Sequence, residues 1–327
     1  MFTEQSLRQY PAIVKAFTGI SSEAFWEMMA VIEQQSEVYE QERHSRAERE
    51  RTEGGGRHFA QPLVIRVAVI LTYLRLHVPQ EVVALLYGCR QSDVSRELRR
   101  LLPLISQVLP VPEVWQVMDP AESVVDELPI EALSDGRVLI DATEQRVNRS
   151  QDTATRDKHY SGKHKAFTLK TQVMTDGEHH IRVISEAVPG SVHDKALADA
   201  LDTVERLPDG CEALADKGYQ GLASQVDYVT VCDTTTGTQY QVLRLTLNTP
   251  FKKPNNQDLS ADQEAFNYRL SAIRILIEHC IGWAKNWAIL ANRFRCDQAI
   301  YTPVFQLVCG LVNAQTLRWQ ARPPYCA

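Results

Sequence analysis

Residues 138–144 read VLIDATE, a short apolar run that leads directly into the acid Asp141. Residues 211–216, CEALAD, place Asp216 in the same way after a second short apolar run. Short apolar runs bounded by polar residues are typical of buried strands, which are covered on both faces. We therefore predict two buried strands, each with an aspartate at its end.

The pattern around these two runs predicts an α/β domain. Residues 165–176 and 179–190 read as two strands joined by an Asp-Gly turn, which predicts a β-hairpin. Helices are predicted for residues 191–207 and, at greater length, for residues 260–292. Three strands, a helix and a fourth strand, with acids at the ends of the first and fourth strands, follow the order of an RNase H-like domain. We therefore expect a mixed sheet flanked by helices.

A third acid, Glu278, lies in the predicted long helix within RILIEHCIGWAKNW, residues 274–287. A carboxylate in so apolar a run needs a partner or a metal. Mg²⁺ binds a few carboxylates together with water and phosphate oxygens, and a pair of such ions can stabilise both oxygens of a phosphoryl transfer. We therefore predict that Asp141, Asp216 and Glu278 are catalytic residues that hold two Mg²⁺ ions.

Each acid also has a structural interpretation. An aspartate after a strand is often a turn or cap residue, and Arg274 stands at helical ion-pair spacing from Glu278. Asp194 is a rival for the second carboxylate. However, Ser191 and Asp194 have the spacing of a helix capping box, which accounts for Asp194 and favours Asp216.

The first half of the chain contains a predicted helix-turn-helix. Residues 80–88 and 91–105 read as a short helix that ends at a glycine and a longer second helix. Its predicted core packs Val82, Val83 and Leu86 against Val94, Leu98 and Leu101. Helical hairpins also occur in proteins that bind no DNA, but the opposite face of the second helix carries residue types that reach bases and phosphates. These predicted DNA contacts are Gln91, Ser92, Ser95, Arg96, Arg99 and Arg100.

Basic residues also surround the predicted active site. The segment of residues 158–170 is rich in lysine and contains no acid, so a hairpin there would face phosphates; a solvated strand is the alternative. Further bases flank the second and third acids. The predicted phosphate contacts are Lys163, Lys165, Lys217, Arg274 and Lys285.

Composition and charge limit the class of protein. The hydrophobic share of 44% and the charged share of 23% are those of a soluble globular chain, and neither a signal peptide nor a membrane span is evident. We therefore expect a cytoplasmic protein without a membrane partner. The seven cysteines are scattered and form no CxxC pair, so neither zinc nor disulfides are expected. The net charge of −6 is unusual for a DNA-binding protein, but bases are concentrated in residues 269–295.

The segments predict four parts of the chain. Residues 1–59 contain N-terminal helices and a charged connector, and residues 60–110 contain the helix-turn-helix. Residues 111–136 form an acidic linker, and residues 137–320 form the α/β catalytic domain.

Taken together, these segments resemble bacterial DDE transposases of the insertion-sequence-five group, which are related to Harbinger-like transposases. Residues 62–105 are similar to the helix-turn-helix of that family. The catalytic motifs that carry the resemblance are IDATE (140–144), YSGKHKAFTLKTQVM (160–174), PGSVHDKAL (189–197), ADKGYQGL (215–222) and RILIEHCIGWAKNWAIL (274–290). One position departs from the family pattern, because Ser271 stands where the family has a tyrosine that makes an auxiliary DNA contact.

The resemblance implies an RNase H-like domain in which Asp141, Asp216 and Glu278 hold Mg²⁺ or Mn²⁺. It also implies excision and insertion of an element with terminal inverted repeats. The partners would be double-stranded DNA at the element ends and at the target, bound by a homo-oligomer at the bacterial nucleoid. Two alternatives remain open: a domesticated nuclease without transposition, and a DNA-binding regulator whose acid triad is vestigial.

Overall fold

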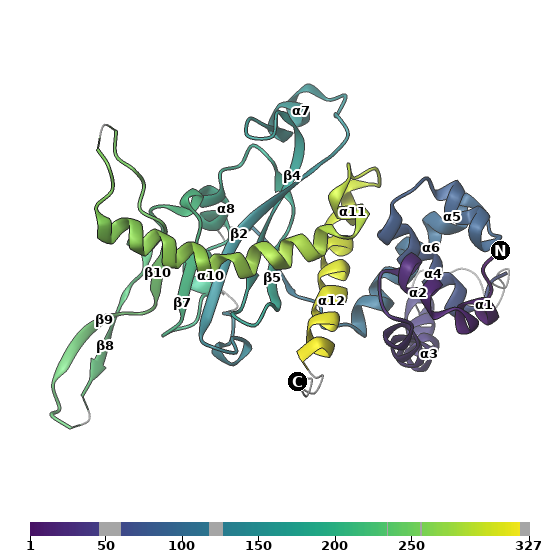
Figure 1. Cartoon of the computed structure of the whole chain (residues 1–327), viewed down its shortest axis with the longest axis horizontal. Helices are drawn as coiled ribbons and strands as arrows, with labels where there is room; N and C mark the ends of the chain where they lie inside the picture. The colour runs from purple at the N-terminus through teal and green to yellow at the C-terminus, as the bar shows by residue number, and fades with distance from the viewer. Residues whose placement is uncertain (46–59, 118–126, 234, 256, 321–327) are drawn as a thin grey trace. The chain divides into compact units, whose positions relative to one another are not determined.

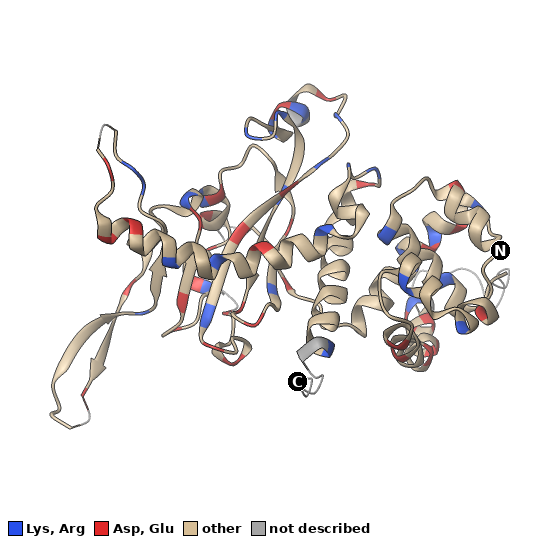
Figure 2. Cartoon of the chain, in the orientation of Figure 1, with Lys and Arg blue, Asp and Glu red and all other residues tan. Residues whose placement is uncertain are grey.

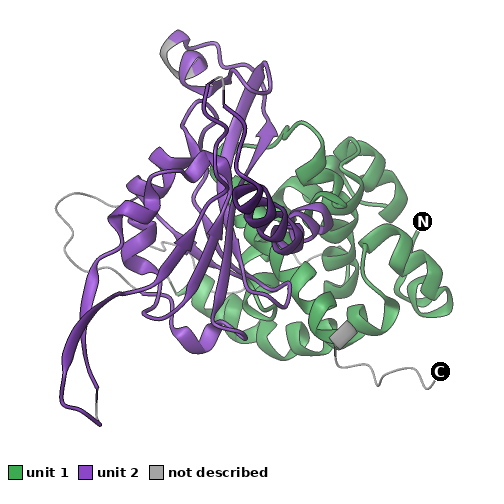
Figure 3. Cartoon of the chain, turned by 60° about the vertical axis from the view of Figure 1, so that its left-hand side comes forward, with its two compact units in different colours: residues 1–111, 284–327 green, residues 112–283 purple. Residues whose placement is uncertain are grey.

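The computed structural model of the protein divides into two compact units (Figure 3). Unit 1 is Met1–Val111 with Ala284–Ala327, and unit 2 is Pro112–Trp283. The predicted catalytic domain, residues 137–320, includes residues of both units. The predicted domain boundaries stay predictions. The residues described are 1–45, 60–117, 127–233, 235–255 and 257–320. Most of the predicted charged connector and the middle of the acidic linker therefore lie outside the described residues.

Unit 1 is helical in its described part. Its α4 is apolar on every side and is buried from Val64 to Leu74, as expected of a helix that other helices surround. Helix α3 has an N-terminal cap, because Ser21 accepts a hydrogen bond from the backbone N–H of Ala24. The helices are α1 Glu4–Gln9, α2 Pro11–Thr18, α3 Ser22–His44, α4 Leu63–Leu76, α5 Gln80–Tyr87, α6 Gln91–Gln107, α11 Ala288–Ala291 and α12 Tyr301–Gln320.

The predicted helix-turn-helix is formed by α5 and α6. Helix α5 ends at Gly88, whose φ of +66° is in the left-handed region that favours glycine. Val83, Val94, Leu98 and Leu101 are buried as predicted. The prediction for Val82 is wrong: its side chain is 44% exposed, because Val83, Ala84 and Tyr87 form the buried face of α5.

Unit 2 contains a mixed sheet, as predicted, with strand order β1-β5-β4-β2-β7-β10 (Figure 1). Its strands are β1 Glu113–Trp115, β2 Arg137–Arg146, β3 Tyr160–Ser161, β4 Ala166–Thr175, β5 Ile181–Ser185, β6 Val188–Pro189, β7 Glu212–Ala215 and β10 Thr246–Asn248. Strand β4 runs antiparallel to β2 and β5, whereas β2, β7 and β10 are parallel to one another. The short strands β3 and β6 pair with β4.

The sheet has helices on both faces. Val138 and Ile140 of β2 belong to an apolar core that includes Leu197, on α8 Asp194–Ala200, and Leu201, which lies between α8 and α9 Thr203–Arg206. Because side chains alternate along a strand, Asp141 faces the other side. There, α10 Ala261–Lys285 crosses the strands (Figure 1). The remaining helix of unit 2 is α7 Thr153–His159.

Four segments differ from the sequence prediction in detail, among them residues 260–292, where α10 is followed by the separate helix α11. The predicted helix 191–207 is two short helices, because Asp202 adopts a left-handed conformation with φ +47° between them. Residues 222–250, for which no element is predicted, form the separate hairpin of β8 Tyr228–Cys232 with β9 Gln239–Leu243, followed by β10. Within the acidic linker, residues 113–115 pair with β5, and Trp115 is buried. In the described residues, no helix combines the length and apolar character needed to span a membrane.

Candidate active site

Asp141 and Asp216 lie side by side because of the register between their strands. The parallel pairing of β2 with β7 ends at Ile140 opposite Ala215, so the next residue on each strand is an aspartate. Neighbouring strands are about 4.8 Å apart. The prediction that Asp141 ends its strand is wrong, because β2 continues to Arg146 along β4. The pairing of β2 with β7 is what stops just before Asp141.

The guanidinium of Arg274 joins the two aspartates. Its Nη2 lies 3.2 Å from Oδ2 of Asp141, and its Nη1 lies 3.2 Å from Oδ1 of Asp216. Arg274 comes from α10 and is only 8% exposed. Within the described residues, it therefore pairs with these two acids and not with Glu278 as the structural interpretation of the sequence suggested.

The pKa of the Asp141 carboxyl is raised above its ordinary value. Burial raises the pKa of Asp141, and the neighbouring carboxylates of Asp216 and Asp194 raise it further. The backbone N–H of Ala142, 2.8 Å from Asp141 Oδ1, and the charge of Arg274 lower this pKa without reversing its direction. Negative charge at this site is therefore only partly compensated.

Tyr219 is a buried residue of unit 2 that lies within electrostatic range of the site acids. Its side chain is fully buried, and its hydroxyl makes no hydrogen bond to the described residues. Burial raises the pKa of Tyr219 far above its usual value, and the charges of Asp194, Asp141 and Asp216 act in the same direction. A buried hydroxyl without a protein partner is a candidate for a hydrogen bond to a bound water or ligand. The sequence predicts a phosphate contact for Lys217, two residues earlier, and no role for this hydroxyl.

Asp194 has an ionic partner that the sequence did not reveal. Lys170 Nζ is 2.6 Å from Asp194 Oδ1 and 3.7 Å from Oε1 of Glu144, which is directly opposite Lys170 in the β2–β4 register. The predicted capping box is wrong: His193 is the N-cap of α8 and makes no side-chain cap, while the Ser191 hydroxyl donates to the carbonyl of Lys158 at 2.6 Å. The cap that would account for Asp194 is therefore absent, although the ion pair with Lys170 still distinguishes Asp194 from Asp216.

The third predicted acid, Glu278, is exposed on α10. It lies one turn beyond Arg274, about 6 Å along the helix axis. In the part of the chain that the structure describes, no group of three or more His, Cys, Asp or Glu side chains is arranged to hold a metal. Asp141 and Asp216 nevertheless fit a cation, since both carboxylates converge on one positive charge and offer the oxygen ligands that Mg²⁺ prefers.

The predicted phosphate contacts of the α/β half differ in exposure. Lys163 and Lys165, between β3 and β4, are exposed, and so is Lys217 beside Asp216. Lys285, in the last turn of α10, is also exposed. Arg274 is buried, so a contact with phosphate requires its side chain to move. Figure 2 shows basic positions around α7 and in the chain that follows it.

The predicted DNA-binding face of α6 is partly engaged within unit 1. Arg100 makes two contacts with the carboxylate of Glu40 on α3, at 2.9 and 2.5 Å. Arg99 is 58% exposed and lies 3.3 Å from Asp297, and Arg96 is exposed beside Asp93. Gln91 and Ser92 are exposed, and Ser95 is half-buried. Arg96 and Arg99 are therefore more accessible to a ligand than Arg100.

Two clefts border α6 within unit 1. One has a volume of about 390 Å³ and includes Gln91, Ser95 and Arg99 in its lining. The other has a volume of about 760 Å³ and is rich in arginine. Its arginines are Arg43, Arg66, Arg90, Arg96 and Arg100.

Comparison with known proteins agrees with this geometry. The sequence profile described as DDE superfamily endonuclease matches residues 140–313, and the helix-turn-helix of DDE superfamily endonuclease matches residues 65–110. A probable transposase for insertion sequence element IS702, from Microchaete diplosiphon, is 27% identical over 176 residues. The match covers 54% of this chain and 56% of the relative. The chain therefore spans about half of the length of that relative. No solved structure matches the chain.

Proposed function

The chain belongs to the DDE superfamily endonucleases, and from that premise we propose that it is a DNA transposase. Asp141, Asp216 and Glu278 would hold Mg²⁺ or Mn²⁺, as two ions, for cleavage and joining of DNA strands. The observation that carries this proposal is the convergence of Asp141 and Asp216 on one buried cation at the end of the β2–β7 pairing. When bound, the metal would stabilise charge on the attacking and leaving oxygens of the phosphodiester.

The residues of this chain would divide the remaining work. Strand β2 carries Asp141, and Asp216 directly follows β7, while Tyr219 has a buried, unpartnered hydroxyl within electrostatic range of both acids among the described residues. The exposed Lys163, Lys165 and Lys217, and Lys285 on α10, would contact DNA phosphates. Such contacts give affinity and position the duplex without reading its sequence.

Recognition of the element ends is assigned to residues 60–110. The exposed side chains of α6, Arg96 and Arg99 in particular, would reach bases and phosphates in the major groove. Catalysis is assigned to residues 137–320 as an RNase H-like domain. The order of three strands, a helical segment and a fourth strand, with one acid on β2 and another directly after the adjacent β7, supports this fold.

The element and the assembly follow from the same proposal. Membership of the insertion-sequence-five group rests on the motifs of the sequence, and the name of the Microchaete diplosiphon relative also refers to an insertion sequence. Transposition joins two element ends to a target, so a homo-oligomer on double-stranded DNA is proposed. Work at the bacterial nucleoid is proposed for the same reason.

The test is metal-dependent cleavage of DNA taken from the flanks of the coding sequence. Wild type is compared with Asp141→Asn, Asp216→Asn and Glu278→Gln, with DNA binding measured in parallel. Glu264→Gln is the matched control, because Glu264 is an exposed acid on the same helix. Loss of cleavage in the three variants, with binding and the control intact, supports the proposal. Binding without cleavage by wild type in both Mg²⁺ and Mn²⁺ contradicts it and favours the regulator.

A paired-end assay separates a transposase from a nuclease. Two copies of the flanking DNA are supplied with a target plasmid, and joined products are scored. Joined products support strand transfer, whereas cleaved ends without joined products identify a nuclease that does not transpose.

A further inference from the structure

Arg274 occupies the position where a metal would be held, although the sequence predicts it as a DNA contact. We propose that Arg274 is an exchangeable counter-cation: it holds Asp141 and Asp216 together in the metal-free protein and releases their oxygens when a divalent metal binds. This inference rests on the proposed metal-dependent function and concerns the loading of that same site.

The first support is the way in which the guanidinium is held. Each Nη group makes one 3.2 Å contact, to Asp141 and to Asp216 respectively. The Nε atom is buried and has no hydrogen-bond partner among the described residues. A guanidinium can donate five hydrogen bonds in a fixed fork, so this arginine uses little of its capacity. It is a cation held by two moderate contacts, and a stronger cation can displace it.

The second support is the charge balance. Asp141 and Asp216 together carry two negative charges if ionised, and Arg274 supplies one positive charge. Asp194 adds a further negative charge within electrostatic range of Asp141, but its own partner is Lys170. A divalent cation matches the two carboxylates fully. It also repels a guanidinium held against the same oxygens, because like charges a few ångströms apart in a buried site interact strongly.

The third support is that the displaced Arg274 side chain can leave the site toward solvent. The side chain of Asp216 is 42% exposed, whereas that of Asp141 is 23% exposed, so the site opens to solvent on the Asp216 side. A guanidinium that leaves the carboxylates toward this side would reach solvent, where a DNA phosphate can approach it. Arginine binds phosphate with paired hydrogen bonds. Arg274 would therefore contact DNA only after the metal has entered, which reconciles its burial with its predicted role.

The test measures Mn²⁺ binding by calorimetry, without DNA, in the full chain. Arg274→Gln removes the competing cation and is expected to bind Mn²⁺ about tenfold more tightly than wild type, or about 1.4 kcal/mol. Arg269→Gln, the same change at an exposed position of α10, should leave the affinity unchanged. In EDTA, Arg274→Gln should melt at a lower temperature than wild type, and Mn²⁺ should raise its Tm by more.

The contradicting outcomes separate the two proposals. Equal or weaker Mn²⁺ binding by Arg274→Gln, with binding abolished by Asp141→Asn, overturns the exchange and leaves the proposed metal site intact. An absence of Mn²⁺ binding in wild type and in Arg274→Gln alike overturns both.

A second measurement needs no variant and covers the case in which Arg274→Gln does not fold. Wild type is treated with phenylglyoxal, which modifies accessible guanidinium groups, in EDTA or in saturating Mn²⁺, and labelled peptides are quantified by mass spectrometry. Modification of Arg274 should increase several-fold with Mn²⁺, while that of the exposed Arg269 stays constant. Unchanged or reduced modification of Arg274 overturns the exchange.

Discussion

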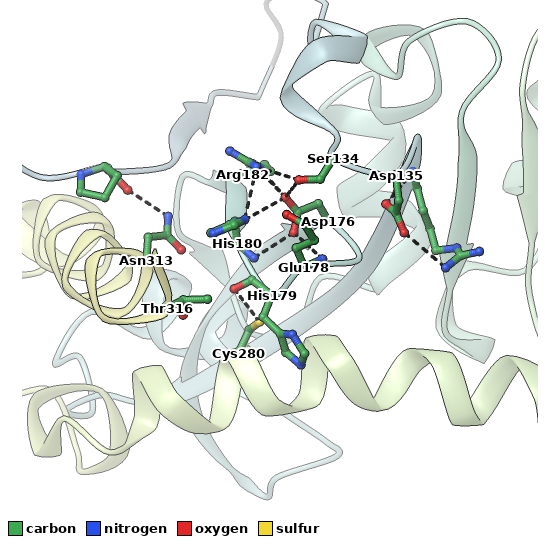
Figure 4. Close-up of polar contacts among 12 residues, drawn as sticks. Ser134, Asp135, Asp176, Glu178, His179, His180, Arg182, Cys280, Asn313 and Thr316 are labelled. Atoms are coloured by element: carbon green, nitrogen blue, oxygen red, sulfur yellow. Dashed lines mark hydrogen bonds and ion pairs between the residues drawn. The ribbon is translucent and has the colours of Figure 1, made fainter. Parts of the chain in front are cut away.

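Unit 2 contains two carboxylate clusters that differ in how their charge is compensated. Asp176, in the turn between β4 and β5, is fully buried and surrounded by donors (Figure 4). Its Oδ1 accepts from the backbone N–H groups of Glu178 and His180, each at 2.9 Å. Its Oδ2 accepts from Arg182 Nε at 2.8 Å and from the Ser134 hydroxyl at 3.2 Å.

The cluster at Asp141 has the opposite balance. The carboxylates of Asp141 and Asp216 share a single guanidinium. The negative charge of a third carboxylate, Asp194, also acts on Asp141. The pKa values differ accordingly. Burial by itself raises the pKa of both acids, but the backbone N–H of His180 and the charge of Arg182 hold the pKa of Asp176 below its usual value. At Asp141, burial prevails and the pKa is raised.

The difference separates a structural acid from a candidate catalytic one. A buried carboxylate whose oxygens are filled by protein donors stabilises the fold and has no capacity for another ligand. Carboxylates that outnumber their donors weaken the fold locally and can accept a cation from solution. Variants at the two clusters should therefore have opposite effects on activity and on stability.

The largest expected effect is the loss of activity in variants of Asp141 and Asp216, the two acids that share one guanidinium. Asp141→Asn or Asp216→Asn should lower metal-dependent DNA cleavage by about a thousandfold or more, because a ligand of the charge-stabilising metal is lost. The Tm of the metal-free variants should equal or exceed that of wild type, since one negative charge is removed. Cleavage assays and thermal melts in EDTA measure the two effects. A large fall in Tm with cleavage retained would assign these acids to the structure.

Asp176→Asn should have the reverse profile. The amide keeps one acceptor but loses charge-assisted hydrogen bonds, so the free energy of unfolding should fall by about 2–3 kcal/mol. Cleavage per folded molecule should be unchanged. Urea unfolding gives the stability, and Asp135→Asn is the matched control because Asp135 forms a partly exposed pair with Arg137 at 3.4 Å. A stability change at Asp176 no larger than that of the control would remove the distinction between the clusters.

Asp194 sharpens the comparison, because it lies near the site yet has a firm partner. Asp194→Asn should weaken the pairing with Lys170 and lower cleavage by about tenfold through misplacement of the neighbouring groups. Mn²⁺ binding should persist. Calorimetry with Mn²⁺ beside the cleavage assay separates the two roles. If Asp194→Asn abolishes Mn²⁺ binding while Asp216→Asn retains it, the second carboxylate has been assigned to the wrong residue.

The smallest expected effect is a difference in acid sensitivity. The carboxyl of Asp176 has a lower pKa in the folded protein than the value of about 3.9 for an unfolded chain. It therefore contributes stability above about pH 3.9, and this stability is lost as the pH falls through the folded pKa. Thermal melts between pH 5 and pH 3 should show a steeper fall of Tm for wild type than for Asp176→Asn. Parallel curves for the two proteins would show that Asp176 is not held in its charged form.

Much of the architecture follows from local sequence patterns. The apolar runs before Asp141 and Asp216 predict neighbouring buried strands, and the Asp-Gly turn predicts the β4–β5 hairpin; both are present. Glycine at position 88 predicts the end of α5 for a stereochemical reason, its left-handed φ. These signals depend on residues close together in the chain.

The contacts that define the site depend on register and on distant segments. Arg274 is 133 residues from Asp141 in the chain, and nothing in its helical spacing distinguishes a partner on β2 from Glu278 one turn away. Lys170 lies opposite Glu144 because of the β2–β4 register. A shift of one residue in this register would place the Lys170 side chain on the other face of the sheet. For the same reason the local spacing of Ser191 and Asp194 predicts a cap that a long-range ion pair replaces.

The central claim is that the under-compensated carboxylates of Asp141 and Asp216 hold a divalent metal. Anomalous diffraction from crystals of the full chain grown in Mn²⁺ tests it most directly. We expect a manganese peak bound by both carboxylates, with the Arg274 guanidinium moved away from them. A peak that also touches Glu278 would identify the third ligand. Saturating Mn²⁺ that leaves no peak at these acids, with Arg274 still between them, would contradict the account.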